Sequence, residues 1–164
     1  MDALTHAMEA YISIQKNPIS DAYATGAVRK ISENLLKVMD NPSDADGRLE
    51  LAQASTMAGI AFSNAMVGMV HSLGHSVGAV CHLPHGLCMN LFLPYVLEYN
   101  KEVNGDRIGE LLLPLGSGVS QDAAAIAALA DPVLTRPYRI ELRNYTGDRA
   151  AFIRAVSTAL GGGD

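Results

Sequence analysis

The sequence has few aromatic residues, only two cysteines and no cluster of basic residues. Trp is absent, and aromatic residues make up 5% of the chain. The formal net charge is −5, and no run of Lys and Arg offers a surface for nucleic-acid phosphates. Cys81 and Cys88 lie in an apolar setting and are typical of free thiols in a reducing cytoplasm rather than of a disulfide framework. The sequence therefore predicts a cytoplasmic protein that does not bind nucleic acid.

Charge is missing altogether from one long stretch. Residues 51–97 contain no Asp, Glu, Lys or Arg, but polar residues and glycines interrupt them, so no window reaches the roughly 18 apolar residues of a membrane-spanning helix. The first residues also lack the basic and apolar regions of a secretory signal. At 164 residues and 49% hydrophobic content, the chain is large enough to bury a core. We expect one globular domain without membrane contact, centred on residues 51–97.

Two kinds of motif are absent as well. Neither G-x-G-x-x-G nor G-x-x-x-x-G-K-[ST] occurs, and the Gly-Ser-Gly at 116–118 lacks the strand-to-helix context of a phosphate loop. The segment HSLGH at 71–75 has the histidine spacing of a zinc protease, but Ser72 stands where that chemistry needs a glutamate as general base. A nucleotide cradle and a zinc protease are therefore not expected.

Helical periodicity dominates what is present. Pro84 should end a helix near Leu83, and Pro94 should kink the helix that follows. Partial strand alternation occurs at residues 136–145. The expected helices cover residues 2–14, 21–39 with Ser20 as N-cap, 43–70, 71–80 as a continuation or a restart, 85–100, 106–115, 123–130 and 148–160. This pattern predicts an all-α fold, a multi-helix bundle of six to eight helices.

Four of the five histidines lie between residues 71 and 85. On a helix, positions i and i+4 share a face, so His71 and His75 can address one ligand, and so can Asp2 and His6 at the start of the chain. Convergent imidazole and carboxylate groups suit Fe(II), Zn(II) and related divalent ions. The two histidine-bearing stretches are candidates for two halves of one metal site.

Other interpretations of these residues stay open at this point. Asp2 and His6 could form a solvated pair, with Asp2 favoured by the helix dipole, and a core histidine is commonly a hydrogen-bonding residue. A compact zinc knot is a further alternative, although the spacing lacks a C-x2-C knuckle; its ligands would be Cys81, His82, His85 and Cys88. The uncharged segment offers no carboxylate to pair with buried imidazoles, which favours a metal as their partner.

The stretches MDALTHAMEAY and GMVHSLGHSVGAVCHLPHGLC resemble the two signatures of the iron-containing alcohol dehydrogenase family, which shares its fold with dehydroquinate synthase and glycerol dehydrogenase. The resemblance covers residues 1 to about 112. It implies that Asp2, His6, His71 and His85 are the metal ligands, and that His75 lies beside the metal and the nicotinamide as a catalytic and cofactor-binding residue. His82 and the cysteines have no role in that pattern.

The resemblance also implies what the chain contains and what it works with. Residues 1–164 would be the helical metal-binding domain, resembling the C-terminal domain of the family, with a divergent or shortened tail at 116–164. The N-terminal Rossmann-like nucleotide-binding domain is absent and would be a missing partner. The cofactors would be Fe(II), with Zn(II) as the alternative, and NAD or NADP. The substrate would be a small alcohol or carbonyl compound, and the protein would form a homo-oligomer.

These implications lead to two functional hypotheses. The first is the metal-binding catalytic half of an NAD(P)-dependent alcohol dehydrogenase that interconverts an alcohol and its aldehyde or ketone, inactive as an isolated chain. The second is a non-catalytic helical metal-binding or assembly module derived from that family.

Overall fold

The computed structural model describes residues 1–112 of the chain. This part contains five helices and no strand: α1 (Asp2–Ile12), α2 (Pro18–Asp40), α3 (Ala45–Ala65), α4 (Met69–Cys81) and α5 (His85–Leu112). The expectation of an all-α fold is confirmed. The helices expected at 123–130 and 148–160 and the strand-like segment at 136–145 lie outside the described residues.

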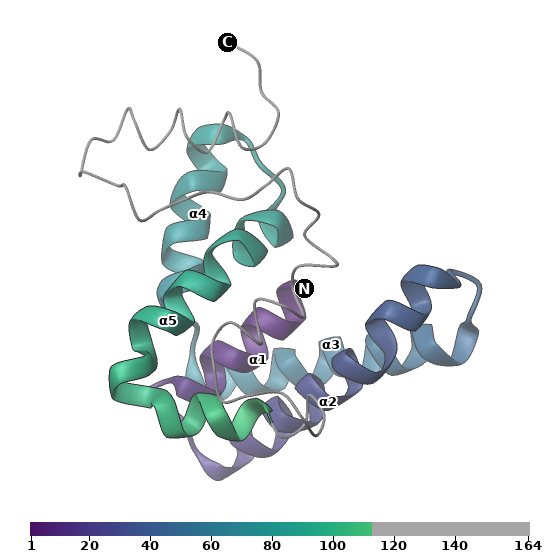
Figure 1. Ribbon diagram of the computed structural model, residues 1–164, viewed down its shortest axis with the longest axis horizontal. Coiled ribbons are helices and arrows are strands. Elements are labelled where there is room, and N and C mark those ends of the chain that lie inside the picture. Colours follow the sequence, from purple (N-terminus) through teal and green to yellow (C-terminus); the bar gives the residue numbers. More distant parts are fainter. Residues whose placement is uncertain (113–164) are drawn as a thin grey trace.

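The short helix α1 lies between two groups of longer helices (Figure 1). It packs against α2 and α3 on one side and against α5 on the other, while α4 packs against α5. Because it has neighbours on several sides, most of α1 is buried, and Ala7, Met8 and Ala10 are fully inaccessible to solvent. Asp2 and His6 are thus carried on a helix that the core holds in place.

Small residues let α3 approach its neighbours closely. A stripe of alanines at helical spacing on α3 is fully buried, and it consists of Ala54, Ala58, Ala61 and Ala65. Methyl side chains keep the distance between helix axes short, as the alanine-rich composition of this segment suggests. The larger buried side chains come from α1 and α5, including Met8, Met89, Phe92 and Leu93.

The second helix begins three residues earlier than predicted. Asn17, rather than Ser20, is the N-cap: its Oδ1 accepts hydrogen bonds from the backbone N–H groups of Ile19 and Ser20, both at 3.1 Å. Ser20 Oγ accepts the Asn17 N–H at 2.9 Å and so completes a capping box. The prediction was wrong because Pro18, which was taken to precede the helix, occupies the first helical position, where its missing N–H costs nothing.

The predicted helix at 43–70 is two helices. Helix α3 ends at Ala65, and Met66 adopts φ 65° and ψ 171° before α4 starts at Met69. Such a conformation is unfavourable for a residue with a side chain, so the surrounding structure has to hold it. The break turns the chain between α3 and α4, and it sets the direction in which His71 leaves the start of α4.

The later helix boundaries follow Pro84. Helix α4 ends at Cys81, His82 is left-handed with φ 55°, and α5 starts at His85, as the proline predicts. The dihedral angles inside α5 leave the helical range at Asn104, between the helices expected at 85–100 and 106–115, whereas they stay helical at Pro94, where a kink was expected. Asn104 has φ −119° and ψ 18°, and it precedes Gly105, a pair of residues typical of a helix interruption.

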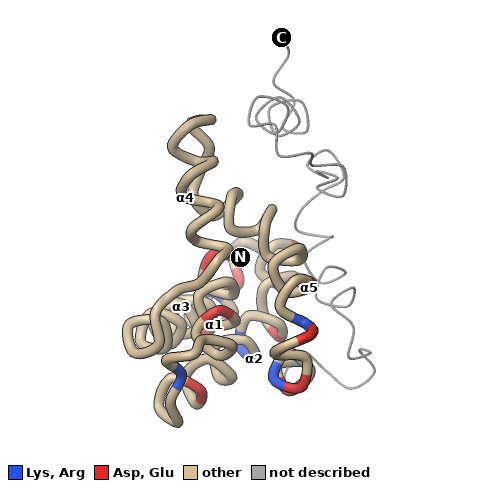
Figure 2. Tube along the Cα trace, turned by 90° about the vertical axis from the view of Figure 1, so that its left-hand side faces the viewer, with Lys and Arg blue, Asp and Glu red and all other residues tan. Residues whose placement is uncertain are grey.

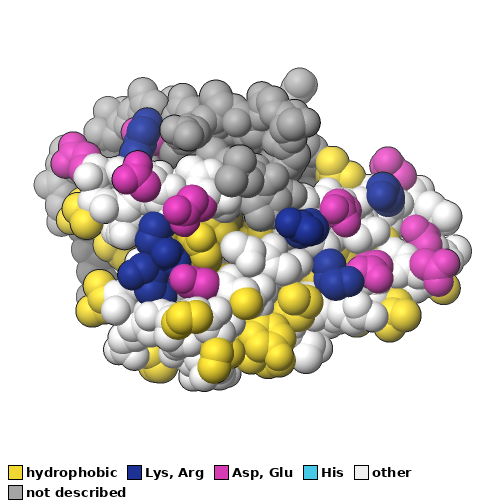
Figure 3. Space-filling model, turned by 90° about the horizontal axis from the view of Figure 1, so that it is seen from below, with side chains coloured by type: hydrophobic (Ala, Val, Ile, Leu, Met, Phe, Trp, Pro, Cys, Tyr) yellow, Lys and Arg dark blue, Asp and Glu magenta, His cyan; other side chains and the backbone are white. Residues whose placement is uncertain are grey.

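The charged side chains of the described chain belong to residues 2–50 and 98–110. Figure 2 shows that α4 and the beginning of α5, residues 85–97, carry no Lys, Arg, Asp or Glu. On the face shown in Figure 3, basic and acidic side chains alternate instead of forming a field of one sign. Within residues 1–112, no helix is both long enough and apolar enough to cross a bilayer.

The far end of α5 is fastened to α1 and α2 by polar contacts. Arg107 donates to the backbone oxygen of Tyr11 from Nε at 3.0 Å and from Nη2 at 2.8 Å. Its Nη2 also donates to Asp21 Oδ1 at 2.8 Å. The guanidinium lies 3.9 Å from the centre of the Tyr11 ring. The Tyr11 hydroxyl donates to Glu110 Oε2 at 2.6 Å. Burial, followed by this hydrogen bond, raises the pKa of Tyr11 to about 12.

This tyrosine should make the protein sensitive to alkali. The unfolded chain releases the tyrosine proton near pH 10, whereas the folded state holds it to about pH 12, so Tyr11 stabilises the fold below pH 10 and loses that effect as pH rises to 12. The loss should reach about 2 kcal/mol at most. Urea unfolding at pH 8, 10 and 11 would measure it, with Tyr11→Phe as the control that lacks this component. Parallel pH profiles for the two proteins would contradict the assignment.

Candidate metal centre

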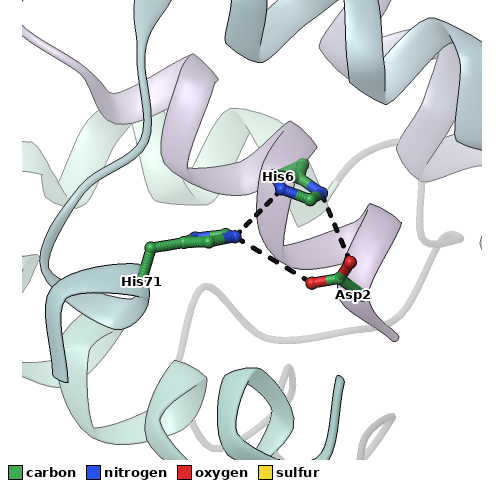
Figure 4. A group of neighbouring side chains, drawn as sticks. All are labelled: Asp2, His6 and His71. Atoms are coloured by element: carbon green, nitrogen blue, oxygen red, sulfur yellow. Dashed lines mark hydrogen bonds and ion pairs between the residues drawn. The ribbon is translucent and has the colours of Figure 1, made fainter. Parts of the chain in front are cut away.

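Asp2, His6 and His71 converge although His71 is far away in the sequence. One potential ligand atom from each lies within 4.8 Å of the other two, and in residues 1–112 no other group of three or more such residues is this compact. His6 Nε2 is 2.9 Å from His71 Nε2, which is itself 3.9 Å from Asp2 Oδ1. Figure 4 shows the two α1 side chains facing the imidazole of His71.

His85 and His75 border this group without joining it as closely. His85 Nδ1 lies 3.2 Å from Asp2 Oδ1, and its Nε2 lies 3.0 Å from Nε2 of His75. Both of these imidazoles are exposed, whereas His71 is buried. The ring centres of His75 and His71 are 5.5 Å apart. The residues that the family resemblance marks therefore lie in one neighbourhood, in which Asp2 stands between His71 and His85.

The carboxylate of Asp2 is the acidic member of this group. Asp2 Oδ1 is buried and has no hydrogen-bond partner, even though His71 and His85 lie near it. Burial is the main cause that lowers the pKa of His6, and this favours its neutral, electron-donating form. The two imidazole nitrogens are 2.9 Å apart, slightly less than the separation of about 3.0–3.4 Å between two ligands that lie about 2.1 Å from one ion at angles of 90–110°. The residues present thus fit a divalent metal.

The partner of His71 on the other side was missed in the sequence. Glu9 is 3% exposed, and its Oε2 lies 2.6 Å from His71 Nδ1. The uncharged segment around His71 contains no carboxylate, which favours a metal as the partner of this histidine. In the structure, α1 also supplies a carboxylate to it. The signal was available, because Glu9 follows Asp2 by seven residues and His6 by three, which places all three on one helix face.

The zinc-knot alternative is not assembled in the described residues. Cys88 is fully buried beside Gly78, where burial raises the pKa of its thiol, while His82 is exposed at the end of α4. Cys81 and Cys88 are both free thiols. Ser72, at the position of a protease glutamate, donates to the backbone oxygen of Gly68 at 3.2 Å. Neither alternative chemistry has its groups in place.

His82 should therefore be replaceable with a gain in stability. It occupies a left-handed position at the helix end, which glycine adopts at lower cost. His82→Gly is expected to raise the free energy of unfolding by about 0.5–1 kcal/mol and to leave metal content unchanged. Chemical denaturation and elemental analysis would test both parts, with Ser63→Gly inside α3 as the destabilising control. A loss of bound metal in His82→Gly would support the alternative zinc site that includes His82.

Comparison with known proteins identifies the family of the chain. Residues 1–159 match the family model described as "Fe-containing alcohol dehydrogenase family, C-terminal". The chain belongs to the iron-containing alcohol dehydrogenase family. The resemblance inferred from the two histidine-bearing stretches is thereby confirmed, as is the correspondence to the C-terminal domain of these proteins.

Its relatives in this family include enzymes for short alcohols. The chain is 41% identical over 128 residues to the NAD-dependent methanol dehydrogenase of Bacillus methanolicus, covering 78% of this chain and 34% of that protein. It is 41% identical over 135 residues to the 1,3-propanediol dehydrogenase of Klebsiella pneumoniae, covering 79% and 35%. The crystal structure of a 1,3-propanediol oxidoreductase superposes with a TM-score of 0.82 at 32% identity, over 99% of this chain and 44% of that one. The chain thus spans about a third of the length of these curated relatives.

Proposed function

We propose that this chain is the metal-binding half of an NAD(P)-dependent alcohol dehydrogenase that interconverts an alcohol and its aldehyde or ketone. The observation that carries the proposal is the buried, unpartnered Asp2 Oδ1 with imidazoles on both sides. The side chain is partly exposed, but this oxygen is shielded from water, and a cation among the imidazoles would pair with it. The family membership identifies the class of reaction for which such a centre would be used.

The ligands in this proposal are Asp2, His6 and His71, with His85 as the fourth. Three nitrogens and one carboxylate oxygen form a donor set that suits Fe(II), and Zn(II) as an alternative. His71 is buried, whereas His85 and Asp2 are both partly exposed, so the group is accessible at the end where these two side chains lie. In this proposal, a small alcohol approaches from this open side.

The chemistry that such an ion supplies is Lewis acidity, which stabilises negative charge on the oxygen of an alcohol. His75 lies on the open side, where its Nε2 is 3.0 Å from that of His85 and its ring is accessible to solvent. We assign it the transfer of the hydroxyl proton to solvent and a contact with the nicotinamide. The nicotinamide of NAD(P)+, when bound, would accept the hydride of the carbinol carbon as the alcohol is oxidised to the carbonyl compound.

The cofactor would be held by a separate α/β domain. The sequence contains no glycine-rich pyrophosphate loop, and the relatives are about three times as long as the region that they share with this chain. In this proposal, residues 1–164 form the helical domain and provide one wall of the active site. The free cysteines are consistent with a reducing cytoplasm as its location.

Metal content tests the proposal directly. The wild-type chain, purified without oxygen and reconstituted with Fe(II) or Zn(II), is expected to hold one ion, and His71→Ala is expected to hold none. His82→Ala is the matched control, because it removes an imidazole outside the ligand group. Elemental analysis after gel filtration gives the stoichiometry. Equal metal content in wild type and His71→Ala would overturn the ligand assignment.

A further inference from the structure

Glu9 connects α1 to the beginning of α4 through three hydrogen bonds. Its Oε2 accepts the backbone N–H of Gly68 at 2.9 Å, and its Oε1 accepts that of Val70 at 2.6 Å. Oε2 also lies 2.6 Å from Nδ1 of His71. The carboxylate is buried, as is the imidazole, so neither group exchanges these contacts for water. No other charged side chain in the described residues is buried to this degree.

The contacts define which nitrogen of His71 carries the proton. Both oxygens of Glu9 already accept a backbone N–H, so the carboxylate is an acceptor toward the imidazole too, and Nδ1 is the donor. A neutral imidazole with its proton on Nδ1 has its lone pair on Nε2. That Nε2 is the atom that faces His6 and Asp2.

The same contacts also fix where the ring lies. Glu9 receives the N–H groups of the first turn of α4, which otherwise lack partners within the helix. His71 belongs to this turn, and the strained residue Met66 precedes it. Glu9 therefore holds both the backbone and the side chain of His71 relative to α1, which also carries Asp2 and His6.

We propose that Glu9 is a positioning residue for the metal centre: it selects the tautomer of His71 and orients Nε2 toward the ion. This inference rests on the proposed function, because it concerns the same centre. When a carboxylate accepts the second ring N–H of a ligating histidine, mutation of that carboxylate typically lowers metal affinity 10- to 100-fold. Glu9 does this while capping the helix that bears the ligand, so removing its charge affects both the ring and the turn.

Glu9→Gln is the main test. The amide keeps the size of the side chain, but its NH2 group must face one of the three donors, so the contact with Nδ1–H or with a backbone N–H is lost. Zn²⁺ affinity, measured by competition with a chelating dye, is expected to fall about 10- to 100-fold. In the metal-free protein, ¹⁵N NMR should find the Nδ1–H tautomer of His71 in wild type and an increased Nε2–H population in the variant. Glu33→Gln, which removes an exposed carboxylate from α2, is the matched control.

A milder variant covers the case in which Glu9→Gln fails to fold. A Cβ added at Gly68 would lie 3.0 Å from Glu9 Oε1, so Gly68→Ala displaces the carboxylate by a few tenths of an ångström without removing it. It is expected to weaken Zn²⁺ binding less than Glu9→Gln while circular dichroism stays at the wild-type level. Unchanged Zn²⁺ affinity in both folded variants, or in Gly68→Ala if Glu9→Gln does not fold, would overturn the proposal.

The outcomes separate this inference from the function on which it rests. If wild type binds Zn²⁺ through His71 and Glu9→Gln binds it equally well with an unchanged tautomer, Glu9 is not the positioning residue and the proposed function stands. If wild type binds no metal at all, the proposed function fails. In that event, the NMR comparison still decides the tautomer: an Nδ1–H form that depends on Glu9 supports its control of His71, and any other result overturns it.

Discussion

Adding Zn²⁺ or Fe²⁺ to the metal-free chain is expected to raise its melting temperature by roughly 5–11 °C at a free metal concentration about a hundredfold above Kd. An ion that binds only the folded state contributes RT ln(1 + [L]/Kd), which is about 2.7 kcal/mol at that excess. A protein of 150–250 residues gains roughly 2–4 °C for each kcal/mol. The unfolded chain cannot reproduce the site, because His6 and His71 are 65 positions apart in the sequence. Differential scanning calorimetry with and without chelator measures the difference.

This increment should depend on pH in a defined direction. Imidazole must be deprotonated to bind a metal, and its ordinary pKa is about 6.5, so the increment should be complete at pH 8 and decrease as pH falls below about 6.5. Burial lowers the pKa of His6, so this ligand stays available to a lower pH than an exposed histidine does. His82→Gly should retain the whole increment and His71→Ala none of it. The same increment at pH 8 and pH 5.5 would exclude imidazole ligands.

The second large effect concerns activity. The purified 164-residue chain is expected to bind its metal but to show no NAD(P)-dependent oxidation of methanol, ethanol or 1,3-propanediol. Activity should arise once an α/β nucleotide-binding half taken from a relative is fused or co-expressed. Holding the nicotinamide against the reacting carbon supplies about 7–11 kcal/mol of the rate enhancement by proximity, and the sequence offers no loop that binds a pyrophosphate. Absorbance of NAD(P)H at saturating cofactor measures turnover.

Two controls make this result interpretable. Metal content and melting temperature of the helical part should be the same with and without the added half, so that a difference in turnover reflects the cofactor. In the active assembly, His75→Ala should lower kcat by about 10²–10⁴-fold and keep the metal, as expected for a proton-transferring group. His82→Ala should leave kcat unchanged. Rapid turnover by the isolated chain would mean that residues 1–164 themselves bind the dinucleotide.

The sequence predicted those parts of the site that depend on local periodicity. Asp2 and His6 are one helical turn apart, and any helix through them places both on one face. The start of a new helix at His85 was likewise predicted from Pro84. The all-α fold was predictable because the apolar positions recur at helical spacing through residues 2–112.

What the sequence analysis did not identify depends in part on contacts between distant segments. The break at Met66 has no proline to mark it, and the first N–H groups of α4 bond to Glu9, which lies about 60 residues earlier, instead of continuing α3. Glu9 was overlooked because a glutamate inside an amphipathic helix is ordinarily a surface residue. Asn17 was overlooked because the serine three positions later is an equally good capping residue.

The division of the helices into two packing groups has a kinetic consequence. Helix α4 packs on α5, and the contacts described above between α4 and α1 are polar: the bonds of Glu9 and the pair of imidazoles. A bound ion would have ligands on both sides of this boundary, on α1 and on α4, so separation of the two helices would remove part of its ligand set and speed its release. Its residence time would then report how often α4 moves away from α1, a local opening that is less costly than global unfolding.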